Sequence, residues 1–143
     1  MKFLPYDPGV LPTKPHPTQG DEIVIKVSGY PPFKDTHFSM RNIRHSNYEA
    51  FLRLRNEAIA VMGGRAWYFG PVGINFVLYA SEMEKGKSLY DYAAGIEDTL
   101  DGSSGCEFTY LPIVFEDDCQ VVKSEMKFVE SDGSRYQIEI EFL

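Results

Sequence analysis

The segment GPVGINFVLYA, residues 70–80, restricts the possible folds of this chain more than any other. It is a run of β-branched, aromatic and other apolar residues, and both of its faces are apolar. A strand of this kind is buried on both sides, which is typical of the interior of a sheet. The sequence therefore predicts a sheet with residues 70–80 as a central strand.

Two segments show the apolar spacing of helices. Residues 46–64, SNYEAFLRLRNEAIAVMGG, have Ser46 or Asn47 as a possible N-cap and end at Gly63-Gly64. The core-facing stripe predicted there is Phe51, Leu52, Leu54, Ala58 and Val61. Residues 87–102, KSLYDYAAGIEDTLDG, predict a second helix that is closed by Gly102. Its predicted buried stripe is Leu89, Ala93, Ile96 and Leu100.

Four further segments have strand-like composition. They are residues 22–29, 109–115, 119–130 and 135–143, and the SDGS at 131–134 predicts a hairpin between the last two. Five of the nine prolines lie in residues 1–20, which are expected to be extended, with the folded domain at 21–143. The order of elements predicts an α+β fold: a single domain with a mixed or mostly antiparallel sheet and two main helices on one side.

Charge is unevenly distributed along the chain. The net charge is −7, but residues 34–65 carry a balance of +3 and residues 82–143 a balance of −10. A basic region beside an acidic one is compatible with a DNA-facing surface next to a metal site, or with ordinary surface scatter. The chain has no apolar run long enough for a membrane span and no targeting peptide at its start, so we expect a cytoplasmic protein.

Three consecutive acids, Glu116-Asp117-Asp118, lie in the segment IVFEDDCQVV. Like charges at this spacing repel one another unless a cation or solvent separates them. The apolar runs on either side draw the segment toward the core. The pattern favours a functional role for Asp117 and Asp118 over a purely solvated junction.

The amino-acid sequence of several segments resembles the RusA-like family of Holliday junction resolvases. The resemblance covers roughly residues 30–128 and is carried by SMRNIRHSNYEAFLRLRNEA, by GPV, by GIEDTLDG and by IVFEDDCQVV. The family pattern is approximately D-x-D-N-x-x-K-x-x-x-D-A-L followed by D-D-x-Q-V. The resemblance implies a homodimeric magnesium-dependent endodeoxyribonuclease of DNA recombination and repair, of phage or bacterial origin, that acts on branched DNA.

Three chemically required positions of this pattern are changed. With Asp98 on the last acid of the helix, Ser88 and Tyr90 stand in place of two catalytic acids and Ala94 in place of the lysine, whereas Asp118 is retained. Carboxylates hold the Mg²⁺ that activates water in such enzymes, and hydroxyls replace them poorly. The resemblance therefore implies weak or absent Mg²⁺ binding and inefficient cleavage.

Other acids are candidates to complete the site. Glu97 lies on the same flank of the predicted helix as Tyr90 and Ala94, so we take Asp118, Asp117 and Glu97 as candidate catalytic residues. Asp118, Asp117 and Asp91 are candidate metal ligands. For Asp91 the alternative is a cap of the helix start, and for Glu97 and Asp101 it is a solvated helix face.

The candidate DNA-binding residues are basic side chains of the loop and helix in the 34–65 region. They are Lys34, Arg41, Arg44, Arg53 and Arg55. The function we expect is a DNA-junction protein that binds without efficient cleavage. The alternatives are an active nuclease with a rearranged carboxylate site and a protein-binding scaffold without a nucleic-acid role. Trp67, Tyr68 and Phe69 are interpreted as core or interface residues.

Overall fold

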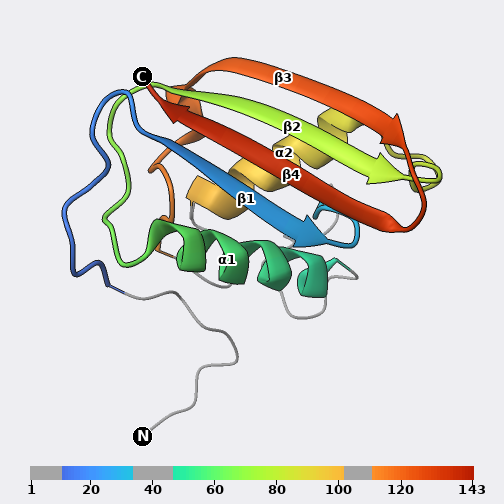
Figure 1. Ribbon diagram of the computed structural model, residues 1–143, viewed down its shortest axis with the longest axis horizontal. Coiled ribbons are helices and arrows are strands. Elements are labelled where there is room, and N and C mark those ends of the chain that lie inside the picture. Colours follow the sequence, from blue (N-terminus) through green and yellow to red (C-terminus); the bar gives the residue numbers. More distant parts are fainter. Residues whose placement is uncertain (1–10, 34–46, 102–110) are drawn as a thin grey trace, which may run out of the picture.

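The computed structural model describes residues 11–33, 47–101 and 111–143, and the statements below refer to these residues. They form an α+β domain of four strands and two α-helices (Figure 1). In chain order the elements are β1 (Glu22–Ser28), α1 (Tyr48–Met62), β2 (Val72–Ala80), α2 (Leu89–Asp101), the short 3₁₀ helix η1 (Asp118–Gln120), β3 (Val121–Glu130) and β4 (Ser134–Phe142). The predicted fold class is confirmed.

The four strands form one mixed sheet in the order β1-β4-β2-β3. β4 is antiparallel to both of its neighbours, and β3 runs parallel to β2. The prediction that residues 70–80 form a central strand is confirmed, since β2 lies between β4 and β3. The predicted hairpin at 131–134 is wrong: β2 separates β3 from β4, and the link between them crosses the end of β2, where the Ser131 N–H donates to the Ala80 carbonyl oxygen.

One face of the sheet is buried and the other is open. Residues alternate strictly along β1, with Ile23, Ile25 and Val27 buried and their neighbours exposed. Ile138 and Ile140 of β4 continue the buried layer, which α1 and α2 cover. Figure 1 shows α2 passing behind the sheet and α1 beside β1. Both helices therefore lie on one side of the sheet, as predicted.

α1 ends as its sequence predicts. Gly63 has a left-handed backbone conformation, with φ of 60°, and its N–H donates to the Ile59 carbonyl oxygen. Asn47 is the N-cap residue, but its side chain makes no capping hydrogen bond; it donates instead to the Phe33 carbonyl oxygen. The predicted apolar stripe is partly wrong, because two of its members are only half-buried while an arginine and a methionine are buried. These are Leu52 and Val61, and Arg55 and Met62.

α2 turns a slightly different face to the core than its apolar residues predict. Ile96 and Leu100 are buried as expected, but Leu89 and Ala93 are only half-buried. The other buried residues of the helix are Tyr92, Gly95, Thr99 and Asp101. Tyr92 is accommodated because its hydroxyl donates to the Glu84 carboxylate at 2.8 Å. Burial is the main reason why the pKa of Tyr92 lies above its usual value.

Residues 111–115 are not a strand, contrary to the prediction. They pack as an irregular buried segment with a single bridge between Phe115 and Tyr68. The backbone N–H groups of Ile113 and Val114 both donate to the Leu100 carbonyl oxygen instead of joining the sheet. No helix in the described part of the chain has the length and apolar character needed to cross a membrane.

Candidate metal centre

The end of α2 carries three of the acids that form the candidate site. Asp98 and Asp101 are three residues apart and so lie on the same side of the helix. Glu97 precedes them, in the last turn and a half. The bonds from Ile113 and Val114 to the Leu100 carbonyl oxygen fix the returning chain against this helix end. The Glu116-Asp117-Asp118 segment therefore begins close to the end of α2.

The turn that carries Asp118 is held by the side chain of Gln120. The amide oxygen of Gln120 accepts from the backbone N–H groups of Glu116 and Asp117 at 2.8 and 3.0 Å. Its amide nitrogen donates to the carbonyl oxygens of Tyr68 and Gly70 at 2.8 and 2.9 Å. One side chain thus closes the turn and attaches it to the chain that enters β2.

Asp98, Asp101 and Asp118 converge. Each offers a carboxylate oxygen, and these oxygens all lie within 4.8 Å of one another. Asp101 is only 3% exposed, Asp98 is half-buried and Asp118 is exposed, so the group extends from the protein interior to the solvent. Such a gradient of exposure suits an ion that keeps part of its water shell.

Glu97 is a fourth carboxyl group beside this cluster. Burial and the negative charges of Asp118, Asp98 and Asp101 raise the pKa of Glu97 to about 7. Desolvation is the largest cause and the repulsion from Asp118 the next. The prediction that Glu97 lies near Asp118 therefore agrees with the structure, and the reading of Glu97 and Asp101 as a solvated helix face is wrong.

The donor atoms of the cluster are all carboxylate oxygens. Asp98 and Asp101 lie at the C-terminal end of α2, where the partial charge of the helix is negative and a cation is favoured. Three carboxylates supply hard oxygen ligands, which Mg²⁺, Mn²⁺ and Ca²⁺ prefer. The donor set therefore fits a divalent cation, and Asp98, Asp101 and Asp118 are the residues that could hold it.

Asp117 and Asp91 do not belong to this group. Asp117 is exposed, and its carboxylate accepts the Cys119 N–H at 3.0 Å, which is the main reason why the pKa of Asp117 lies below its usual value. Asp91 accepts from the backbone N–H of Ser88 at 2.9 Å, so it caps the start of α2. Asp117 and Asp91 thus each stabilise a helix start, and their role as metal ligands stays a prediction.

The three changed positions of the family pattern lie outside the cluster. Tyr90 is 77% exposed at the start of α2, and the hydroxyl of Ser88 is hydrogen-bonded to Asp91. Ala94 lies in the following turn. The two aspartates of α2 that do converge, Asp98 and Asp101, lie about three turns further along the chain than Ser88 and Tyr90.

The candidate DNA-binding residues are only partly described. Lys34, Arg41 and Arg44 lie outside the described residues. Arg53 is exposed on α1, whereas Arg55 is 2% exposed and its guanidinium lies 5.8 Å from the centre of the Phe51 ring. Since a buried guanidinium is not available to phosphates, the prediction for Arg55 is corrected.

The sequence analysis did not identify two candidate ligands, Asp98 and Asp101, or the positioning residue Gln120. Asp98 was used only to align the family pattern and Asp101 was placed on a helix flank, although their three-residue spacing is the signal for two carboxylates on one side of a helix. Gln120 was read only as part of the DDCQV motif. Nothing in the local sequence indicates that its amide reaches Tyr68 and Gly70, which precede it by about fifty residues.

The comparisons with known proteins give no family. No protein-family model matches this chain, and no curated protein matches it either. The RusA-like resemblance and the magnesium it implies stay predictions. What the structure adds is a group of three aspartates that could hold a metal ion.

Proposed function

We propose that this protein is a divalent-metal-dependent endodeoxyribonuclease that acts on branched DNA through a rearranged carboxylate site. The observation that carries the proposal is the convergence of Asp98, Asp101 and Asp118 within 4.8 Å. The RusA-like motifs of the sequence support branched DNA as the class of substrate. Of the functions left open by the sequence, this one makes the fullest use of the clustered acids.

The roles of the residues follow from their burial. Asp101 is the interior ligand, and Asp98 and Asp118 complete the set toward solvent. A bound Mg²⁺ would polarise an oxygen of the substrate phosphate and would make a water molecule bound to it more acidic. Glu97 is a fourth, half-buried carboxyl group beside the cluster, and its carboxylate oxygens could accept a proton from that water. Gln120 holds Asp118 in place through the turn.

A second candidate is binding of branched DNA without efficient cleavage. It is favoured by one observation: Ala94 occupies the place of the family lysine, so the cation that would stabilise charge on the phosphate is missing from that position. The two candidates share the fold and differ in turnover. A slow or absent reaction with intact junction binding supports the second.

The experiment combines metal binding with a cleavage assay. Mn²⁺ binding is measured by calorimetry for the parent protein and for Asp98→Asn and Asp118→Asn, and a synthetic four-way junction is incubated with each in Mg²⁺ or Mn²⁺. We expect each substitution to weaken Mn²⁺ binding at least about tenfold and to abolish cleavage. Asp117→Asn is the matched control, because it removes the adjacent charge while keeping an oxygen that can accept the Cys119 N–H.

Two results would count against the proposal. If the parent protein binds no Mn²⁺, the cluster is not a metal site. If Asp118→Asn and Asp117→Asn bind Mn²⁺ equally well and cleave equally well, the clustered aspartate has no special role. Junction binding with Mn²⁺ bound but no cleavage selects the second candidate.

A further inference from the structure

Phe69 lies on the surface directly after a buried residue. Its side chain is 65% exposed, whereas Tyr68 is buried. Single exposed apolar side chains are common on proteins, so the exposure of Phe69 indicates no function by itself. The pairing of its segment, however, places it next to the candidate metal centre.

Phe69 lies beside the turn that carries Asp118. Two parallel pairings, one before Phe69 and one after it, bring its segment against the segment that contains η1. They are Tyr68 with Phe115 and Val72 with Val121. Residues 69–71 therefore run alongside residues 116–120. The exposed Phe69 ring is thus a neighbour of the exposed ligand of the aspartate cluster.

The backbone on both sides of Phe69 is held in place. The amide nitrogen of Gln120 donates to the carbonyl oxygens of Tyr68 and Gly70, and the Tyr68 N–H donates to the Val114 carbonyl oxygen at 2.8 Å. Gly70 lies so close to the Tyr68 ring that a Cβ atom at Gly70 would be 2.8 Å from it. A ring carried by a fixed segment loses little conformational freedom when it binds a ligand.

We propose that Phe69 stacks on the nucleobase next to the scissile phosphate and thereby selects bases at the branch point of DNA. This inference rests on the proposed function. A base inside a duplex is stacked on both sides, whereas a base at the branch point of an open junction lacks a stacked neighbour on one side. Its free face meets an aromatic ring at little unstacking cost. Every base has such a face, so the preference is for the position of the base and not for its identity.

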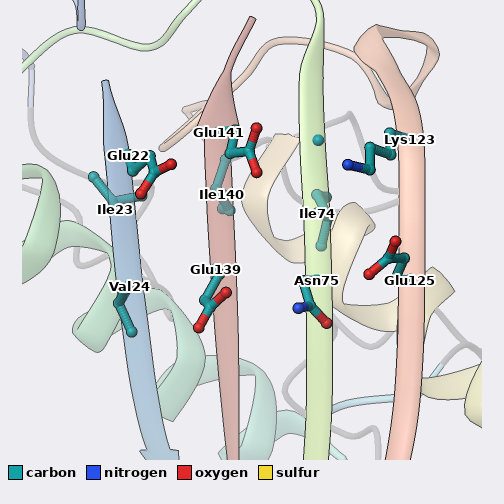
Figure 2. A pocket seen from close by; sticks show the side chains of 11 residues that line it. Glu22, Ile23, Val24, Ile74, Asn75, Lys123, Glu125, Glu139, Ile140 and Glu141 are labelled. Carbon is teal, nitrogen blue, oxygen red and sulfur yellow. The ribbon is translucent and has the colours of Figure 1, made fainter. Parts of the chain in front are cut away.

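The charges around Phe69 favour an uncharged contact of this kind. The adjacent turn carries three acids, and Figure 2 shows a pocket that includes Gly73, near the start of β2, on the face of the sheet opposite the helices. The carboxylates around this pocket are those of Glu22, Glu125, Glu139 and Glu141. Carboxylates repel phosphates, so the affinity of this end of the domain for DNA comes from a bound cation and from stacking.

Fluorescence anisotropy of a labelled four-way junction and of a linear duplex of equal length tests the contact. Both are titrated with protein in Ca²⁺, an ion that prefers oxygen ligands, at low and at high salt. Phe69→Leu keeps an apolar side chain and removes the ring, so it should weaken junction binding about tenfold. The factor should be the same at both salt concentrations, because stacking releases no counterions. Phe69→Trp should bind the junction as tightly as the parent protein.

A fluorescent base reports the stacking directly. The analogue 2-aminopurine is placed at the branch point, and its fluorescence falls when it stacks on an aromatic ring. The parent protein and Phe69→Trp should quench it, and Phe69→Leu should not. Binding of the linear duplex should change less than about twofold in Phe69→Leu, since a duplex offers no free base face.

Tyr90→Leu is the matched control. Tyr90 is an aromatic residue of similar exposure, at 77%, but it precedes Asp98 by roughly 12 Å along α2. Tyr90→Leu should leave junction binding at the parent value. Calorimetry with Mn²⁺ should give Phe69→Leu the affinity of the parent protein, because the ring is not part of the aspartate cluster.

The outcomes distinguish the role of Phe69 from the proposed function. If Phe69→Leu binds the junction as tightly as the parent protein, or weakens junction and duplex binding equally, the stacking proposal is overturned and the nuclease function stands. A loss of Mn²⁺ affinity in Phe69→Leu also overturns it, since the ring then supports the metal centre and not the substrate. A parent protein that does not bind the junction overturns the proposed function, and the stacking proposal with it.

Discussion

The side-chain amide of Gln120 donates to the backbone carbonyl oxygen of Tyr68 at 2.8 Å. This hydrogen bond joins two segments that are 52 residues apart in the sequence. The same side chain makes three further hydrogen bonds, to Gly70 and to the backbone of Glu116 and Asp117. Asp118 follows directly. The position of the candidate metal ligand Asp118 therefore depends on a nearby side chain that lies outside the aspartate cluster.

Replacing Gln120 by alanine should destabilise the protein and weaken its metal binding. Four hydrogen bonds are lost, and we expect the free energy of unfolding to fall by about 2–4 kcal/mol, as measured in urea. Mn²⁺ affinity should fall as well, because the turn that holds Asp118 loses its closure. Gln137→Ala is the control, since the half-buried Gln137 makes one side-chain hydrogen bond within the described residues, to Glu139. Equal effects of the two substitutions would refute the role given to Gln120.

Glu97 should make the metal-free protein less stable as the pH rises. In the folded state its pKa is about 7, above the ordinary value of 4.5, so between these values the folded protein holds a proton that the unfolded chain has released. Stability from this group is full below pH about 4.5 and is lost as the pH rises through about 7. Glu97→Gln cannot lose a proton and should flatten this dependence.

Melting temperatures in EDTA at pH 5 and pH 8 give the measurement. The drop from pH 5 to pH 8 should be smaller in Glu97→Gln than in the parent protein. Glu130→Gln, at the exposed end of β3, is the matched control and should keep the parent's dependence on pH. Identical pH profiles for the parent and Glu97→Gln would show that the environment of Glu97 is not the one described.

Gly95 should tolerate no side chain. A Cβ atom at this position would collide with the carbonyl group of Pro32 and lie 2.8 Å from the Cα of Phe33, and both contacts are backbone atoms that cannot turn away. We expect Gly95→Ala to cost about 3 kcal/mol of unfolding free energy, although alanine favours helices. Ala94→Gly, one residue earlier, should cost only about 1 kcal/mol. A stabilised Gly95→Ala would show that α2 does not pack this closely on residues 31–33.

Asp91 should matter for stability and not for metal. Its carboxylate accepts from the Ser88 N–H at the start of α2, so Asp91→Ala should lower the unfolding free energy by about 1 kcal/mol. Mn²⁺ affinity should stay at the parent value, in contrast to Asp98→Asn. Calorimetry on the two variants side by side separates a cap from a ligand, and a loss of affinity in Asp91→Ala would restore it to the metal site.

Much of the fold follows from local patterns. The alternation in residues 22–29, the run at 70–80 and the glycines at 63–64 each placed an element correctly, because burial and backbone conformation act there within a few residues. The pairing of β3 and β4 did not follow. A Ser-Asp-Gly-Ser turn permits a hairpin, but whether a third strand enters between the two is decided by contacts that are distant in sequence.

The residues of the candidate site were likewise predicted only in part. Asp118 and Glu97 were identified from motif and helix spacing, whereas Asp101 was placed on a solvated flank although it is buried. Helix periodicity gives the side of α2 on which Asp101 lies but not which segment packs there. The bonds from residues 113 and 114 to Leu100, which create the cluster, involve backbone atoms and leave no mark in the sequence.

The crossing of β2 by the link between β3 and β4 has a consequence for how the protein is made. β4 follows the other three described strands in the sequence, yet it lies inside the sheet and separates β1 from β2. Among the described strands β1 pairs with β4 alone, so β1 joins the sheet only once residues 134–142 have been made. A chain that lacks β4 therefore leaves the edges of β1 and β2 unpaired and open to aggregation.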